Sequence, residues 1–183
     1  MIRISSGKAK NIQLNTPNIP GYRGVQEVAK QALFNILEDE IKDKVCLDLY
    51  AGSGNIGIEA LSRGAKICDF VDENKKAVKV IEENLEKTGF SDCGEVIRSD
   101  AVKYVANTPE KYDVIFADPY YENISHIHLF KNLEEILKPD GVIAFFHSKN
   151  LDWEKTLKDT NFEIKDQRRF GISFFTLITH LTN

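Results

Sequence analysis

Asp48-Leu49-Tyr50-Ala51-Gly52-Ser53-Gly54 is the stretch of this chain that decides its fold. An apolar run at 44–50 leads into a glycine-rich loop, and helical spacing of apolar residues begins at Ile56. Residues 52–57 read Gly-Ser-Gly-Asn-Ile-Gly, which matches the GxGxxG pattern of nucleotide-binding strand–loop–helix units. Glycines let a backbone approach a ligand closely, and the start of a helix offers free N–H groups. The stretch therefore predicts an α/β protein with a nucleotide-like ligand at this loop.

Strands and helices alternate after this loop. The apolar patterns predict further strands at 66–71, 95–98, 112–117 and 142–146, separated by helices at 56–63, 74–87, 101–106 and 125–137. A helix at 25–40 precedes them, and a short helix at 151–158 follows. Two late strands, 162–168 and 172–179, lie too close together for a crossover, so we expect an antiparallel hairpin at one edge. The pattern predicts a three-layer, Rossmann-like fold with a mostly parallel seven-stranded sheet, the layout of class I methyltransferases.

The N-terminal segment has a different character. Strand-like residues at 2–5 and 12–14 flank a Ser-Ser-Gly-Lys turn, which predicts a small β-hairpin. The prolines and glycines of 16–24 indicate a loop. We therefore expect one domain over 1–183, with 1–24 as an N-terminal hairpin and loop extension.

Composition indicates the class of protein. The chain has 183 residues, 42% hydrophobic and 28% charged, which is ordinary for a globular protein. It contains no apolar run of membrane-spanning length, and its first residues lack the apolar core of a signal peptide. Its three cysteines show no metal-binding spacing. We expect a reduced, cytoplasmic monomer that uses neither a membrane nor a metal.

Acidic residues follow three successive strands, where ligands of such sheets bind. A carboxylate at Asp48 can engage a positively charged amino-acid group and would repel a pyrophosphate, so it favours S-adenosylmethionine over NAD; it could instead orient the loop backbone. Asp72 can accept both ribose hydroxyls of either cofactor, and Asp100 can accept an adenine amino group or cap the helix that follows. The predicted cofactor-binding residues are Asp48, Tyr50, Ala51, Gly52, Ser53, Gly54, Asp72, Asp100 and Ala101.

The fourth strand of the alternation ends in Asp118-Pro119-Tyr120-Tyr121. This resembles the (Asp/Asn)-Pro-Pro-aromatic motif of enzymes that methylate exocyclic amino groups of nucleobases. Hydrogen bonds to the Asp118 carboxylate and the Pro119 carbonyl would hold an amino nitrogen for in-line transfer, and Tyr121 would stack on the base. The four residues are the predicted catalytic residues; the alternative is a strand end with two ordinary tyrosines.

A nucleic-acid substrate requires basic residues. Residues 1–30 carry a net charge of +4, although the whole chain carries −4. The candidates for RNA binding are Arg3, Lys8, Lys10, Arg23 and Lys30. A second group of basic and aromatic residues, Lys165 and 168–170, is explained equally well as a solvated strand edge.

Residues 46–65 resemble the RsmD family, the bacterial 16S rRNA (guanine-N2)-methyltransferases, above all in Gly-Ile-Glu-Ala-Leu-Ser-Arg-Gly-Ala at 57–65. Ile2-Arg3-Ile4 with Gly7-Lys8, Ala32–Leu37, Asp118-Pro119, Pro139-Asp140-Gly141 and Arg169-Phe170-Gly171 are similar too. The resemblance covers nearly the whole chain. It implies S-adenosylmethionine at Asp48, Gly52, Gly54, Asp72 and Asp100, guanine at 118–121, and 16S rRNA within a small-subunit particle as the partner.

Three positions differ from the family pattern. Arg23-Gly24-Val25 replaces Arg-Pro-Thr, Lys30 replaces an arginine, and Tyr120 replaces the second proline of the motif. All three lie near the expected substrate side. The alternatives that stay open are an adenine-N6 methyltransferase of DNA or RNA, a degenerate homologue that binds cofactor or RNA without catalysis, and an NAD-dependent dehydrogenase.

Overall fold

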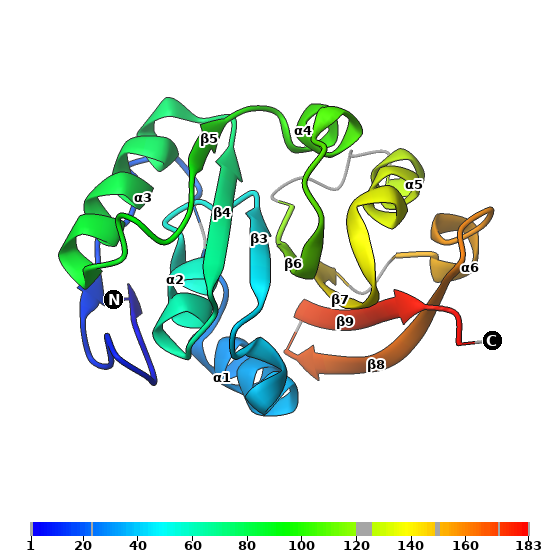
Figure 1. The fold of residues 1–183 in the computed structure, drawn as a ribbon, viewed down its shortest axis with the longest axis horizontal. Coiled ribbons are helices and arrows are strands. Elements are labelled where there is room, and N and C mark those ends of the chain that lie inside the picture. Colours follow the sequence, from blue (N-terminus) through cyan, green and yellow to red (C-terminus); the bar gives the residue numbers. More distant parts are fainter. Residues whose placement is uncertain (1, 23, 120–125, 149–150, 172, 183) are drawn as a thin grey trace.

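The computed structural model of the chain describes residues 2–22, 24–119, 126–148, 151–171 and 173–182. Its centre is a sheet in the strand order β5-β4-β3-β6-β7-β9-β8 (Figure 1). Strands β3 to β7 are parallel, whereas β9 is antiparallel to both β7 and β8. The strands are β3 (Val45–Leu49), β4 (Ile67–Asp72), β5 (Val96–Arg98), β6 (Tyr112–Ala117), β7 (Leu137–Ser148), β8 (Phe162–Phe170) and β9 (Ser173–His180). The predicted seven-stranded sheet with an antiparallel hairpin at one edge is confirmed.

Helices cover both faces of this sheet (Figure 1). Consecutive strand residues alternate between two hydrophobic clusters, so that Cys46 joins one and Leu47 joins the other. The first cluster contains α1 (Glu27–Leu37), α2 (Asn55–Ser62) and α3 (Lys75–Thr88). The second contains α4 (Ala101–Asn107), α5 (His126–Ile136) and α6 (Trp153–Thr156). Burial on both faces is the reason that the parallel strands read as continuous apolar runs.

The N-terminal hairpin pairs β1 (Ile2–Arg3) with β2 (Gln13–Leu14) and lies against α2. In its turn, the N–H of Lys8 donates to the Ser62 carbonyl at 2.8 Å, and the N–H of Ala9 donates to Ser62 Oγ at 2.9 Å. Gly7 has a φ of 80°, and a Cβ at this position would lie 1.7 Å from the Ser62 carbonyl oxygen, so glycine is required here. The turn thus satisfies polar groups at the C-terminus of α2.

Three predicted elements differ from the structure in extent by more than the others, whose ends shift by three residues at most. The helix expected at 25–40 is α1 followed by a 3₁₀ turn, η1 (Glu38–Ile41), because Glu38 adopts a φ of 31° and interrupts the α-helix. The helix expected at 151–158 is only the single turn α6. Strand β7 begins at Leu137, before the predicted start at 142, because Leu137 pairs with Tyr112. Pro139-Asp140-Gly141 lies in the register shift between this pair and the pair Val142–Val114.

Candidate active site

Three residues of the loop between β3 and α2 adopt the left-handed backbone conformation that favours glycine. Gly52 and Gly54 have φ values of 58° and 74°, and Tyr50 also adopts a positive φ of 59°. Gly57 has a different role, because a Cβ there would lie 2.4 Å from the ring of Phe70 on β4. The first two glycines therefore shape the loop, and the third lets α2 pack closely on the sheet.

Asp48 is buried on β3 beneath this loop. Its Oδ2 accepts the N–H of Gly57 at 2.9 Å. Burial raises the pKa of Asp48 well above its ordinary value; the Gly57 hydrogen bond opposes this rise, and the charges of Asp118 and Asp72 add to it. The structure thus shows the backbone-orienting role, and it also places three carboxylates near one another.

Asp72 ends β4 and is half-buried beside the same loop. Its Oδ2 accepts the N–H of Gly52 at 2.9 Å, and its Oδ1 accepts the N–H of Asn74 at 2.8 Å. Each carboxylate oxygen has two lone pairs, so both oxygens can accept a further hydrogen bond. Asp72 therefore holds the glycine loop in place and can still bind hydroxyl groups.

Asp100 lies at the next strand end. The N–H of Ser99 donates to the Asp72 carbonyl at 3.2 Å, which places this segment beside β4. Asp100 Oδ1 accepts the N–H of Lys103 at 2.8 Å, so the side chain caps α4, and it is exposed. Ala101 is buried at the first position of that helix. The structure thus shows the helix-capping role, which is one of the two interpretations of Asp100 given by the sequence.

Tyr50 is half-buried on the side of the sheet that α4 covers. Its hydroxyl is buried and has no hydrogen-bond partner among the described residues. Burial raises the pKa of Tyr50, and the charges of Asp100 and Glu73 raise it further. A polar group of a ligand would satisfy this hydroxyl, because a buried and unpaired hydroxyl is costly.

Asp118 and Pro119 follow β6, the strand next to β3. The N–H of Asp118 donates to the Leu49 carbonyl at 3.5 Å, which brings this strand end beside the start of the glycine loop. Burial raises the pKa of Asp118 to about 6. Tyr120 and Tyr121 lie outside the described residues. The sheet thus brings Asp118 to the same edge as Asp48 and Asp72.

Tyr22 belongs to this site although it was not predicted. Its hydroxyl donates to Ser53 Oγ at 2.9 Å and accepts the N–H of Ser53 at 3.2 Å. Its ring covers Gly52, where a Cβ would lie 2.8 Å from Tyr22 Cε2. Burial raises the pKa of Tyr22, its bonds to Ser53 lower it, and the charges of Asp48 and Asp118 raise it. An aromatic residue in the Pro/Gly loop at 16–24 was the only signal in the sequence.

Asn84 of α3 is a second residue that the sequence did not single out. Its Nδ2 donates to the Ser53 carbonyl at 2.8 Å and to the Asn15 carbonyl at 3.0 Å. Its Oδ1 accepts the N–H of Asn15 at 2.8 Å. The buried amide thus joins the N-terminal segment to the glycine loop. An asparagine within a helical pattern carries no signal of such a role.

Lys30 requires a correction, because it does not form part of an RNA-binding surface. Its side chain is 0% exposed. Its Nζ donates to the Arg3 carbonyl at 2.6 Å and to Asn55 Oδ1 at 2.9 Å, and it pairs with Glu27 and Glu59 at 3.2 Å each. The ammonium group is therefore used inside the protein, where it joins α1, α2 and the hairpin.

The other predicted RNA-binding residues that the structure describes do not all lie together. Arg3 is exposed on β1. Lys8 and Lys10 are exposed in the hairpin turn at the C-terminus of α2, whereas the glycine loop lies at its N-terminus. Arg23 lies outside the described residues. Direct RNA contact by Arg3, Lys8 and Lys10 stays a proposal.

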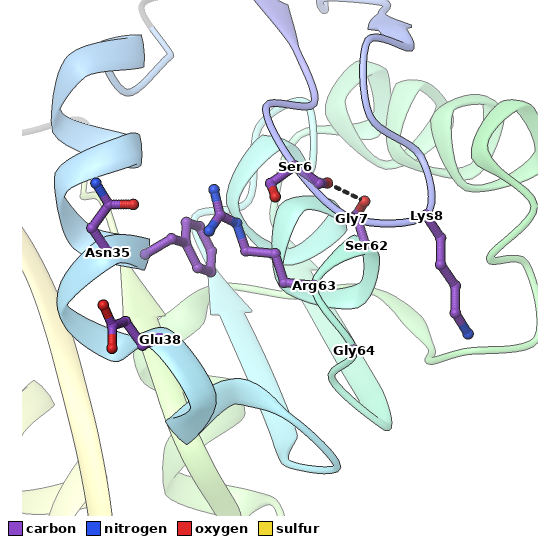
Figure 2. Close-up of a pocket in the computed structure, with 9 residues that line it drawn as sticks. Ser6, Gly7, Lys8, Asn35, Glu38, Ser62, Arg63 and Gly64 are labelled. Carbon is purple, nitrogen blue, oxygen red and sulfur yellow. Dashed lines mark hydrogen bonds between the residues drawn. The ribbon is translucent and has the colours of Figure 1, made fainter.

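A pocket of about 690 Å³ lies between the hairpin turn, α1 and the end of α2 (Figure 2). Arg63 crosses it with its guanidinium 4.9 Å from the centre of the Phe34 ring, while Lys8 points away (Figure 2). Its lining residues are Ser6, Gly7, Lys8, Phe34, Asn35, Glu38, Ser62, Arg63 and Gly64. None of the predicted cofactor and catalytic residues that the structure describes lines it.

Within the described ranges, no group of three or more His, Cys, Asp or Glu side chains is arranged to hold a metal ion. Across the same part of the chain, no helix combines the length and apolar character that a membrane crossing requires.

Comparison with known proteins gives the family of the chain. Residues 2–179 match the family model described as Conserved hypothetical protein 95. The "Ribosomal RNA small subunit methyltransferase D" of Haemophilus influenzae is 37% identical over 186 residues, which cover 96% of this chain and 92% of that protein. The protein of the same name from Escherichia coli K12 is 32% identical over 143 residues, 78% of this chain and 70% of that protein.

A solved structure has the same fold. "Putative methyltransferase yhhF from Escherichia coli" aligns over 100% of this chain and 99% of that one, with a TM-score of 0.85 at 24% identity. The family model and the sequence relatives show that the chain belongs to the RsmD family, the family of ribosomal RNA small subunit methyltransferase D.

Proposed function

We propose that this protein is an S-adenosylmethionine-dependent methyltransferase that methylates N2 of a guanine in 16S rRNA of the small ribosomal subunit. The observation that carries the proposal is the position of Asp118, beside the glycine loop and the buried Asp48. Membership of the RsmD family supports rRNA as the substrate, and a ribosomal substrate implies a cytoplasmic protein.

The electrostatics of the site suit a cationic cofactor. The charges of Asp118 and Asp72 both raise the pKa of Asp48, and none of the three carboxylates forms an ion pair with a described lysine or arginine. A sulfonium and an α-ammonium group would relieve this repulsion, whereas a pyrophosphate would increase it. The site therefore favours S-adenosylmethionine over NAD.

The cofactor would be held by groups at three strand ends. The glycine loop and Asp48 would bind its amino-acid part, Asp72 its ribose, and Tyr50 with Asp100 its adenine side. When bound, S-adenosylmethionine supplies an electrophilic methyl group. The protein contributes positioning and electrostatic complementarity, which are the main sources of rate enhancement for such a transfer.

Asp118 would act on the amino group of the base. A guanine amino nitrogen is a weak nucleophile because its lone pair is delocalised into the ring. The Asp118 carboxylate and the Pro119 carbonyl would accept hydrogen bonds from this group and direct its lone pair. After transfer, the Asp118 carboxylate can take the proton that the methylated nitrogen loses, since its pKa of about 6 leaves it mostly ionised at neutral pH. Tyr121 would stack on the base, as predicted from the motif.

The proposal is tested with small ribosomal subunits from a strain that lacks this protein. We expect the purified protein to transfer methyl groups from tritiated S-adenosylmethionine to these particles, and mass spectrometry to locate one N2-methylguanine. Asp118→Asn should abolish transfer and change the affinity for S-adenosylhomocysteine less than threefold. Asp92→Asn removes an exposed carboxylate and serves as the matched control.

Three results would contradict the proposal. Transfer to duplex DNA, or to an adenine, would favour the adenine-N6 alternative. Cofactor binding without transfer to any ribosomal substrate would indicate a degenerate homologue. Normal turnover by Asp118→Asn would exclude Asp118 as a catalytic residue.

A further inference from the structure

Three side chains form a continuous stack across the C-terminal strands. Arg169 on β8 lies opposite Phe174 on β9, and Phe174 lies opposite His147 on β7. The Arg169 guanidinium is 5.9 Å from the centre of the Phe174 ring. The Phe174 and His147 rings are stacked with centroids 5.4 Å apart and planes 14° apart. We call Arg169, Phe174 and His147 the stacked row.

On β9 and β7, the stacked row is more accessible than the neighbouring row on the same face of the sheet, whose β8 member Gln167 is exposed like Arg169. Arg169 is exposed, and Phe174 and His147 are half-buried. In the neighbouring row, Thr176 and Phe145 are both 0% exposed. Core packing therefore accounts for the inner row, but it leaves an aromatic stack with a cationic end at the surface.

Neighbouring side chains fix the orientation of the His147 ring at the inner end of this stack. His147 Nε2 forms a 2.8 Å hydrogen bond with Thr176 Oγ1, to which Gln167 Nε2 also donates at 2.8 Å. Trp153 of α6 packs edge-on against the His147 ring, with centroids 5.0 Å apart. These side chains are already ordered before binding. A partner that extends the stack therefore costs the protein little conformational entropy.

The strand register places the inner end of the stacked row beside the strand end that carries the proposed catalytic residues. Phe145 on β7 pairs with Ala117 on β6, and the two strands run parallel. His147 and Pro119 each follow these residues by two positions. Because β6, β7, β9 and β8 follow one another in the sheet (Figure 1), the row extends from the strand beside β6 to the outer strand β8.

Charge distinguishes Arg169 from its basic neighbours on β8. Arg168 pairs with Asp166 at 2.9 Å, and Lys165 pairs with Glu40 at 3.6 Å. Arg169 Nε donates to the Gly171 carbonyl at 2.9 Å, and no described acidic side chain forms an ion pair with it. Its positive charge is therefore not neutralised within the described part of the protein.

We propose that the stacked row binds single-stranded RNA beside the target nucleotide, with a base stacked on the Arg169 guanidinium, which Phe174 supports from the other side, and a phosphate near the same cation. Aromatic rings and guanidinium planes are the groups on which unpaired bases stack, and an unpaired cation complements the phosphate charge. The inference rests on the proposed function for its substrate. It adds a surface that the catalytic motif and the basic N-terminal segment do not supply.

Arg169→Ala and Arg168→Ala provide a matched test. Both variants remove one exposed arginine, but Arg168 and Arg169 project from opposite faces of the sheet. We expect Arg169→Ala to weaken binding of a fluorescent single-stranded RNA about tenfold, and to reduce the slope of log affinity against log salt by about one. We expect Arg168→Ala to weaken it less than threefold. Phe174→Leu keeps an apolar side chain without an aromatic face, and should also weaken binding several-fold.

Methyl transfer provides the second measurement. With small ribosomal subunits, Arg169→Ala should raise KM about tenfold while kcat and the affinity for S-adenosylhomocysteine change less than twofold. Equal effects of Arg168→Ala and Arg169→Ala would overturn the proposal, as would a wild-type protein that does not bind RNA. If the wild type binds RNA through Arg169 but transfers no methyl group to rRNA, the proposed function fails and the RNA surface stands.

Discussion

The Tyr22 hydroxyl donates a hydrogen bond to Ser53 Oγ at 2.9 Å and accepts the Ser53 N–H at 3.2 Å. This double contact joins the loop before α1 to the glycine loop after β3, across 31 residues of sequence. Because the Tyr22 ring also covers Gly52, the N-terminal extension is part of the candidate active site.

Tyr22→Phe should weaken cofactor binding, because it keeps the ring but leaves two polar atoms of Ser53 without their partner. The loss of about 1 kcal/mol corresponds to a roughly fivefold higher Kd for S-adenosylhomocysteine, measured by calorimetry. Tyr104→Phe is the control: it removes a hydroxyl that is 2.7 Å from the Tyr112 hydroxyl, away from this loop. Equal Kd values for Tyr22→Phe and the wild type would show that the contact does not order the cofactor site.

The pH dependence of methyl transfer should follow the ionisation of Asp118. Burial raises the pKa of Asp118 to about 6, and only the carboxylate can accept hydrogen bonds from the amino group with both oxygens. We expect kcat/KM to be constant above pH 7 and to fall about tenfold per pH unit below about pH 6. The profile should be measured with short assays on intact particles. A decrease of kcat/KM that begins only near pH 4 would mean that Asp118 titrates as an ordinary aspartate or is not required.

Asp118→Asn should stabilise the protein at neutral pH. The pKa of Asp118 is raised on folding, so ionisation above about pH 6 opposes the folded state, and this effect disappears below about pH 4. An amide of similar shape has no such penalty. We expect a gain on the order of 1 kcal/mol in the free energy of unfolding at pH 7.5, and none at pH 4, from urea unfolding at both pH values. A loss of stability at pH 7.5 would contradict the raised pKa.

Lys30→Met should destabilise the fold. Burial alone would raise the pKa of Glu59, but hydrogen bonds from Ser5, the charge of Lys30 and a hydrogen bond from Arg63 together hold it below its ordinary value. Removing Lys30 leaves Glu59 buried with fewer partners, which should cost about 3 kcal/mol in urea unfolding at pH 7. Lys8→Met, at an exposed position, should change stability by less than about 0.5 kcal/mol. Comparable values for the two variants would show that the buried network is unimportant.

Gly57→Ala should lower stability because the added methyl group has no room. Its Cβ would lie 2.4 Å from Phe70 Cε1 and 2.7 Å from Cys68 Sγ. Overpacking of this kind costs about 1–3 kcal/mol. Phe70→Leu removes part of the ring, so the double variant should lose less than the sum of the two single losses, as a double-mutant cycle would measure. Simple additivity would show that the backbone of α2 moves away from β4 instead.

The order of strands and helices was predictable from sequence because their periodicities differ and each pattern is local. The acids at the strand ends were predictable for a related reason. Parallel strands place their carboxyl ends at one edge, so Asp48, Asp72 and Asp118 had to approach each other once the sheet was known. The extents of α1 and α6 were less predictable, because the backbone of Glu38 and the packing of Trp153 depend on neighbours distant in sequence.

The sequence by itself determined the fold class, the position of the glycine loop and the family, since these depend on periodicity and on contiguous motifs. Only the tertiary structure decided that Tyr22 binds Ser53, that Lys30 is buried between α1 and α2, and that Arg169 stacks with Phe174. The physical reason is that these contacts join segments through packing, which no local pattern encodes. The sequence pattern around a lysine, a tyrosine or an arginine does not distinguish whether its side chain contacts solvent, a helix or an aromatic ring.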